Sequence, residues 1–249
     1  MKRYLPFVIF WFILNLIQSF FTEIIDDEAY YWVYSHFLSW GYFDHPPMIA
    51  WLIRIGSALL PGELGVRLMP SLLGAGTLFL TFHMIKDQVE DHRLLMLVIF
   101  SIPLFHANVA GFIATPDLPL VFFATLFFFL YKRYLANETL GNILLLGLSI
   151  ALMLYSKYHA FLIIGFTLLS NPKILLRRSF WLMALFASLL YLPHIIWQFK
   201  HHFVSFGYHL IDRNRPFEVK HILEYFGNQL IMVGPLVGIF LLYLGIGHK

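Results

Sequence analysis

The chain has 249 residues, of which 59% are hydrophobic, 18% aromatic and only 12% charged, whereas a soluble domain carries roughly 25% charged residues. A chain of this length cannot bury so much apolar surface in its own core, but a lipid bilayer can solvate it, so a water-soluble globular protein is excluded. The net charge of +3 gives little reason to expect a nucleic-acid partner, and the absence of cysteine excludes disulfides and thiolate nucleophiles. The composition indicates an integral membrane protein.

Apolar runs of about 20 residues are long enough to cross a bilayer. The first run, 5–24, follows Lys2 and Arg3 and lacks a small-residue cleavage site, so we expect an uncleaved signal-anchor helix. Further single spans are predicted at residues 66–85, 94–113, 117–131, 179–197 and 222–245.

The stretch 141–170 needs a different treatment. As one helix it would be about 45 Å long, too long for the hydrocarbon core, and it would leave Lys157 inside the membrane. Splitting it into 141–155 and 158–170 moves Lys157 to a water-facing turn and places the basic residues before and after the hairpin on the same, cytoplasmic side. The sequence therefore predicts a single all-α membrane domain over residues 1–249, with eight spans and both termini inside.

The first outer segment, residues 26–64, is long and rich in aromatic residues. Its rings suit interfacial helices that lie in the headgroup layer. Asp26, Asp27 and Glu28 open this segment, where the helix dipole favours negative charge. The acidic cluster alone is equally consistent with simple helix capping.

Other unusual polar residues share the outer side in this topology. Asp117 opens the fourth span, Lys157 lies in the hairpin turn, and a histidine-rich loop follows Trp197. Taken singly, each has a plain structural explanation, such as a helix cap for Asp117 or a snorkelling side chain for Lys157. His45 can be an interfacial histidine and Arg67 a headgroup contact. Their gathering on one face favours a substrate site.

These residue types allow one chemistry in particular. A carboxylate such as Asp27 or Glu28 can act as general base on an acceptor hydroxyl, while cations from His45, Lys157 or Arg67 can stabilise a departing phosphate. The chain has no glycine-rich phosphate loop, which favours a lipid-linked donor over a soluble nucleotide. The weakest candidate is a metal site at three histidines that lack the HExxH pattern, His201, His202 and His209.

Six ordered blocks of the chain carry a family resemblance. They are Asp27–Trp32, Gly41–Pro47, Val66–Leu68, Thr115–Leu120, Ser156–Tyr158 and His202–Phe206. Through them the chain resembles bacterial members of the GT-C glycosyltransferase superfamily, related to dolichyl-phosphate-mannose–protein mannosyltransferases and to lipid A aminoarabinose transferases. The resemblance implies a GT-C-like helical bundle and transfer of a sugar from a polyprenyl-phosphate carrier to a lipid or protein acceptor, with inversion, at the outer face of the bacterial inner membrane.

The resemblance also implies roles for individual residues. Asp27 matches the family's catalytic acid, Glu28 is its neighbour in the motif, and Asp117 matches a second outer acid. His45 stands where aminoarabinose transferases carry lysine, and Lys157 matches a lysine at the cavity, so both are expected to contact the donor phosphate. Arg67 joins them as a third cation, and the substrate cavity is expected to include Tyr30, Tyr31, Tyr42 and Asp44.

No cofactor is required by the sequence, although carboxylates at Asp27 and Asp117 are compatible with a divalent metal ion. The resemblance covers the N-terminal half of such proteins, so we expect the C-terminal part to be missing, as in a fragment, a split enzyme with a separate partner half, or an inactive remnant. Two alternatives from other classes are a transporter or flippase-like protein, which would place paired charges at the bilayer midplane, and a non-catalytic scaffold.

Overall fold

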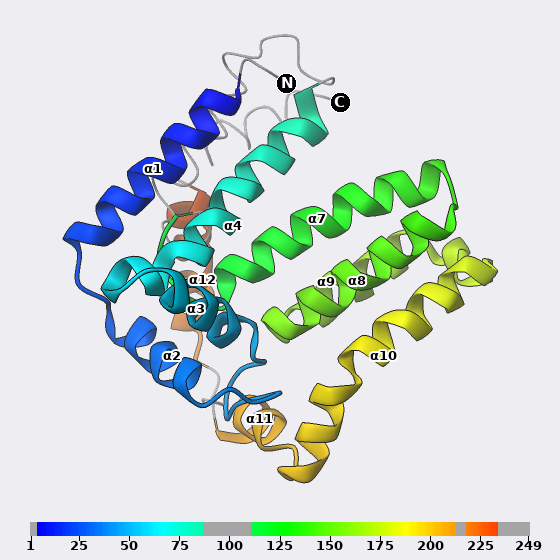
Figure 1. The fold of residues 1–249 in the computed structure, drawn as a ribbon. Helices are drawn as coiled ribbons and strands as arrows, with labels where there is room; N and C mark the ends of the chain where they lie inside the picture. Colours follow the sequence, from blue (N-terminus) through cyan, green and yellow to red (C-terminus); the bar gives the residue numbers. More distant parts are fainter. Residues whose placement is uncertain (1–3, 87–110, 213–217, 234–249) are drawn as a thin grey trace.

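The computed structural model describes residues 4–86, 111–212 and 218–233, and every regular element within these ranges is helical (Figure 1). The helices are α1 (Leu5–Phe21), α2 (Asp26–His36), α3 (Met48–Leu59), α4 (Gly62–Ile85), α7 (Asp117–Ala136), α8 (Leu140–Ser156), α9 (Ala160–Ser170), α10 (Arg178–Lys200), α11 (Val204–Gly207) and α12 (Lys220–Val233), with short helical turns at Pro172–Leu176 and Tyr208–Asp212. The predicted all-α fold is confirmed.

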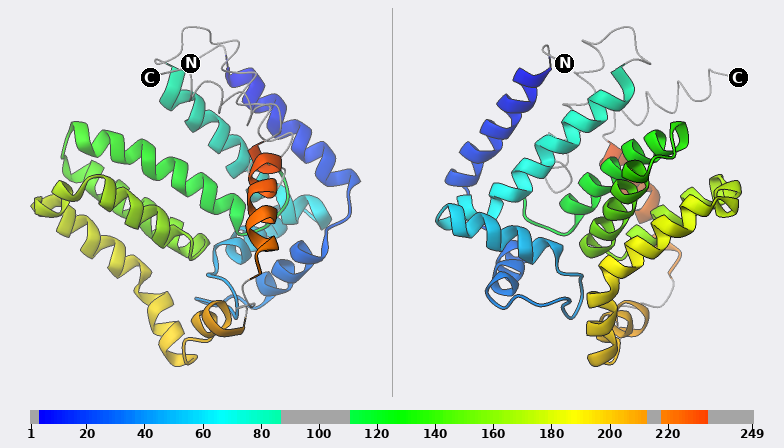
Figure 2. Two further views of the ribbon diagram at one scale, coloured as in Figure 1. Left: turned by 180° about the vertical axis from the view of Figure 1, so that it is seen from behind. Right: turned by 45° about the vertical axis from the view of Figure 1, so that its right-hand side comes forward.

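The long helices form a row in which each packs on the next. α1 contacts α4, α4 contacts α7, α7 contacts α8, and α8 contacts α10. At one end of the row, where α7 begins and α8 and α10 finish, Figure 1 shows α2, α3 and α11 gathered together. We call this the site end. α12 lies on the far face of the molecule in Figure 1, which the left view of Figure 2 turns toward the reader.

Within the described residues, α4, α7 and α10 are long and apolar enough to cross a membrane, and α1 reaches the same criterion together with α2. α2 turns from the axis of α1 by 92°, as an interfacial helix after a first span should. α3, α8 and α9 are shorter apolar helices. Most of the predicted span 94–113 and the second half of the predicted span 222–245 lie outside the described residues, so the count of eight spans stays a prediction.

The predicted break in the stretch 141–170 is confirmed, because α8 ends at Ser156 and α9 starts at Ala160. α9 returns toward the end of the row where α8 begins, because Asn171 Nδ2, at the end of α9, donates to the Tyr131 hydroxyl of α7 at 3.1 Å. The two helices therefore form the predicted hairpin. At the same end the Tyr134 hydroxyl of α7 lies 2.7 Å from Ser179 Oγ of α10.

Several helix ends lie beyond the apolar runs that predicted them. α4 begins at Gly62 instead of residue 66, α7 continues from 131 to Ala136, and α10 reaches Lys200. Lysine, arginine and glutamine, which extend α7 and α10, are good helix formers, and a cation such as Arg133 in the last turn is stabilised by the helix dipole. Hydropathy marks the part of a helix that suits lipid, and the helix itself extends further.

The site end is held by a close crossing of α3 and α4. A Cβ atom at Gly56 would lie 2.2 Å from the carbonyl oxygen of Gly65, and one at Gly65 would lie 2.1 Å from the carbonyl oxygen of Leu60. The two backbones are thus in direct contact, with no room for a side chain between them. This contact holds the C-terminal half of α3 against the start of α4.

Candidate active site

An ion pair joins the start of α7 to the turn after α8. Lys157 Nζ donates to Asp117 Oδ1 at 2.6 Å; the lysine side chain is 17% exposed and the aspartate 45%. Asp117 stands in the first turn of α7, where the dipole favours a carboxylate, and Lys157 is the C-cap of α8, where it favours a cation. The pair presents an accessible carboxylate beside a positioned ammonium group.

Asp44 lies in the loop between α2 and α3 and accepts hydrogen bonds from two tyrosines of α2. The Tyr30 hydroxyl donates to Asp44 Oδ1 at 3.2 Å, and the Tyr34 hydroxyl donates to the same atom at 3.4 Å. The two hydroxyls also contact one another. This polar cluster reaches the protein surface at Tyr30, which is 40% exposed.

His45 is stacked between two rings, with centroids 5.8 Å from Tyr31 and 5.9 Å from His209. Burial, together with the positive charge of Lys157, lowers its pKa to about 4, although the negative charge of Asp44 opposes both effects. The imidazole is therefore neutral at neutral pH. Its Nδ1 is buried and has no hydrogen-bond partner among the described residues.

Tyr31 shows how closely the acidic groups gather. Burial raises the pKa of its phenol, and the negative charges of Asp44, Asp27 and Asp117 raise it further. Acids from three separate segments thus act on the Tyr31 phenol. The phenol stays protonated and is available only as a neutral hydrogen-bonding group. Asp27 itself is exposed in the first turn of α2.

A cavity of about 270 Å³ lies next to this cluster and is lined by Lys157, Tyr158, His159, Leu162 and His209. His209 also lies against the loop, with Nε2 2.7 Å from the carbonyl oxygen of Asp44. The cavity therefore connects the ammonium group of Lys157 with the histidine that stacks on His45.

A polar network that was not predicted from the sequence holds this loop in place. His194 Nδ1 lies 2.6 Å from the carbonyl oxygen of Trp40. Gln198 Nε2 donates to the Tyr158 hydroxyl at 2.6 Å and to Ser205 Oγ at 2.7 Å, and Ser205 Oγ donates to the carbonyl oxygen of Tyr42 at 2.7 Å. His194 and Gln198 are four residues apart on α10, a spacing that puts them on one helix face. Two polar residues at this spacing in a largely apolar run could have indicated the network from the sequence.

Three other predicted residues lie apart from the cavity. Glu28 and Arg67 form a buried ion pair behind the first turn of α2, with the arginine side chain 1% exposed and the glutamate 0%. Tyr42 is also committed to structure, because its hydroxyl donates to the carbonyl oxygens of Tyr34 and Phe37 at 3.0 and 3.1 Å. The structure brings Asp44, His45, Asp117 and Lys157 together with Tyr31 and places Glu28, Arg67 and Tyr42 in the surrounding frame.

The histidine-rich segment gives no metal site. Within the parts of the chain that the structure describes, no group of three or more histidine, aspartate or glutamate side chains is arranged to hold a metal ion. His201 and His202 are exposed, and of the three histidines considered only His209 reaches the cavity. The carboxylates of Asp27 and Asp117 are not part of such a group either.

Residues 44–197 match the family model described as dolichyl-phosphate-mannose-protein mannosyltransferase. The match covers more than half of the chain, and the chain belongs to this family of GT-C membrane glycosyltransferases, which confirms the resemblance seen in the sequence. The matched region contains Asp44, His45, Asp117 and Lys157.

Two curated relatives are similar to much of the chain. The lipid A galacturonosyltransferase RgtD of Rhizobium johnstonii is 25% identical over 227 residues, which cover 87% of this chain and 48% of RgtD. An uncharacterized protein of Aquifex aeolicus is 30% identical over 155 residues, covering 58% of this chain and 31% of that protein. The chain spans about half the length, or less, of these relatives. No solved structure matches it.

Proposed function

We propose that this protein transfers a sugar from a polyprenyl-phosphate carrier to an acceptor hydroxyl, with inversion, and that residues 1–249 act as one membrane domain. The observation that carries the proposal is the grouping of Asp27, Asp117, Lys157 and His45 at one end of an apolar helical row. Family membership supports it. The name of the relative RgtD favours a glycolipid of the lipid A type as acceptor over a protein.

In this proposal Asp27 is the general base. The acceptor oxygen attacks the anomeric carbon, its proton passes to the Asp27 carboxylate, and the bond between the anomeric carbon and the phosphate oxygen breaks, so that polyprenyl phosphate leaves with the bonding electrons. An exposed carboxylate at the first turn of α2 is free to receive an incoming hydroxyl. Attack from the side opposite the leaving group inverts the anomeric centre.

Lys157 and His45 hold the leaving phosphate in different ways. Asp117 keeps the Lys157 ammonium at the cavity before substrate binds, so that its charge is ready for the phosphate without reorganisation. His45, neutral by virtue of its burial, contributes a ring N–H donor in place of the cation that the sequence suggested. Arg67 is left out of this set, because its donors are used within the frame.

A groove of about 360 Å³ gives the lipid carrier a place to lie. It runs between α8, α9 and α10, is lined by apolar side chains such as Leu154, Phe161 and Ala184, and reaches Phe206 beside Tyr158 of the smaller cavity. A prenyl chain is wholly apolar and matches the apolar lining of this groove, where it can make close van der Waals contacts. We propose that the chain follows the groove while its phosphate reaches Lys157.

We propose that the site faces the outside of a bacterial inner membrane. Basic side chains gather at the end of the row opposite the site, where Arg133, Lys173 and Arg178 lie close to the ends of α7 and α10. Cytoplasmic loops carry an excess of lysine and arginine. This distribution supports a cytoplasmic position for the opposite end and an outer position for the site end.

Release of free polyprenyl phosphate from a panel of polyprenyl-phosphate sugars, by membranes that contain this chain, tests the proposal. We expect Asp27→Asn to abolish release while leaving expression and membrane insertion unchanged. Asp26→Asn, the neighbouring exposed acid, is the matched control and should retain release. Undiminished turnover by Asp27→Asn would reject Asp27 as the base, and no release by the unaltered chain from any donor would reject the transferase.

A further inference from the structure

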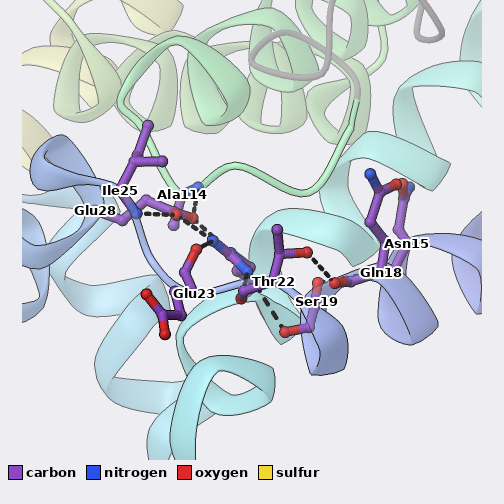
Figure 3. A network of polar contacts seen from close by, with 9 residues as sticks. Asn15, Gln18, Ser19, Thr22, Glu23, Ile25, Glu28 and Ala114 are labelled. Carbon is purple, nitrogen blue, oxygen red and sulfur yellow. Dashed lines mark hydrogen bonds and ion pairs between the residues drawn. The ribbon is translucent and has the colours of Figure 1, made fainter.

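Glu28 and Arg67 form a buried ion pair. Figure 3 shows Glu28 in this network, with Ile25 and Ala114 beside it. Arg67 Nε donates to Glu28 Oε1 at 2.8 Å, and Arg67 Nη2 donates to Glu28 Oε2 at 2.5 Å. The Glu28 carboxylate also accepts from the backbone N–H groups of Ile25, at 3.1 Å, and Ala114, at 2.8 Å. The contact with Ala114 reaches the segment that leads into α7.

The remaining donors of Arg67 hold the end of α1. Nη1 donates to the carbonyl oxygen of Thr22 at 2.7 Å and more weakly to that of Ser19 at 3.4 Å, and Nη2 donates to that of Glu23 at 2.8 Å. Removing two charges from water is costly, and a buried pair persists only where further hydrogen bonds satisfy it. Here every nitrogen of the guanidinium and both carboxylate oxygens have partners.

This saturation conflicts with the roles that the sequence suggested for the two residues. Glu28 has no exposed oxygen with which to accept a proton, and Arg67 has no nitrogen left for a donor phosphate. Adjacent residues on a helix point about 100° apart, so Asp27 faces out while Glu28 faces the interior. The exposed Asp27 is accessible to substrate, whereas the buried Glu28 is accessible only to its partners within the protein.

The pair joins the two halves of the site. Asp27 precedes Glu28 in the sequence, in the first turn of α2, and Ala114 lies three residues before Asp117. Ala114 is fully buried, packed with Ile49, Ile53 and Val66 of α3 and α4. A shift of the pair would therefore change the distance between Asp27 and the Asp117–Lys157 ion pair.

We propose that Glu28 and Arg67 are positioning residues, which set the separation between the base at Asp27 and the phosphate-binding pair at Asp117 and Lys157 without touching substrate. The proposal rests on the function proposed above. Glu28 and Arg67 thus form one structural link, here called the pin, which connects α2 to the segment that leads into α7.

Kinetics separate this role from direct phosphate binding. We expect Glu28→Gln and Arg67→Lys each to lower kcat by about 10- to 100-fold, since small misplacements of catalytic groups cost that much, while the donor KM stays within about two-fold because Lys157 and His45 are unchanged. Arg54→Lys, at an exposed arginine of α3, is the control and should match the parent. A raised donor KM for Arg67→Lys together with an unchanged kcat for Glu28→Gln would overturn the proposal.

A distance measurement tests the pin without any turnover. The chain contains no cysteine, so Val33→Cys on α2 and Phe128→Cys on α7, both at exposed positions, allow two spin labels to be placed without background. We expect a narrow distribution of label distances in the parent and in Arg54→Lys, and a broader or shifted one in Glu28→Gln and Arg67→Lys. An unchanged distribution, or a changed one with normal kcat, would overturn the proposal.

The two readouts also distinguish this inference from the proposed function. If the unaltered chain transfers no sugar, the transferase assignment fails, and the label distances alone decide whether the pin exists. Arg67→Lys keeps the positive charge and loses only part of the hydrogen bonding, so it remains informative if Glu28→Gln does not accumulate in membranes.

Discussion

Lys157 is fixed by Asp117 at 2.6 Å in a turn between two helices, so its charge is in place before a substrate arrives. We expect Lys157→Met to raise the donor KM by about 10- to 100-fold, since an oriented cation on a phosphate is worth several kcal/mol in a water-poor site, and Lys157→Arg to recover part of the loss. Lys200→Met, at the exposed end of α10, serves as control. An unchanged donor KM for Lys157→Met would remove this lysine from the phosphate site.

The burial of His45 has a consequence for stability against pH. Its pKa falls from about 6.5 to about 4 on folding, so the unfolded chain binds the extra proton first as pH falls, and stability decreases between about pH 6.5 and pH 4. We expect His45→Gln to make thermal unfolding less dependent on pH in this window. His201→Gln, at an exposed histidine, should follow the parent curve. Parallel curves for the parent and His45→Gln would contradict this account.

At the level of single residues, topology predicted that Asp117, Lys157 and His45 share one side of the membrane, and the structure places them in one cluster. The pairing of Lys157 with Asp117 was not predictable, because it depends on where α8 ends and α7 begins. The burial of Glu28 was not predicted either, although the helical turn between adjacent residues already separates an inward from an outward side chain.

At the level of elements, the crossing of α3 and α4 depends on two glycines. We expect Gly56→Ala to destabilise the fold by about 1–3 kcal/mol, because its Cβ would lie 2.2 Å from a backbone oxygen that cannot move aside. Gly141→Ala, in α8 with open space around it, should be neutral or stabilising by up to about 1 kcal/mol. Thermal unfolding in detergent measures both, and equal midpoints for the two variants would show that α3 and α4 can separate at no cost.

Helix existence was easier to predict than helix ends. Apolar runs located α1, α4, α7 and α10, and the mid-membrane lysine argument located the break between α8 and α9. The short helix α3 was anticipated only as part of an interfacial segment, since its residues lack a long apolar run. α11 and the turn before it depend on left-handed backbone at His202 and Phe203, which no hydropathy pattern indicates.

At the level of the whole molecule, the apolar groove between α8, α9 and α10 is the proposed path of the lipid carrier. We expect Ala184→Trp, which fills the groove, to raise the KM for a long-chain donor by about ten-fold or more. The effect should be smaller on a donor whose lipid is cut to a few isoprene units, because a short lipid makes fewer packing contacts with the groove. Leu185→Trp, on the adjacent exposed face, is the matched control. Equal effects of the two tryptophans would place the carrier elsewhere.

The hydrogen bond from Ala114 to Glu28 joins residues 86 positions apart, and this bears on how the protein is made. A nascent chain that has emerged only as far as α4 can already pair Glu28 with Arg67, yet it still lacks the N–H group that completes the carboxylate. The N-terminal helices therefore reach their final arrangement only after the ribosome has passed residue 114. Completion of this buried corner thus waits for the segment that leads into α7.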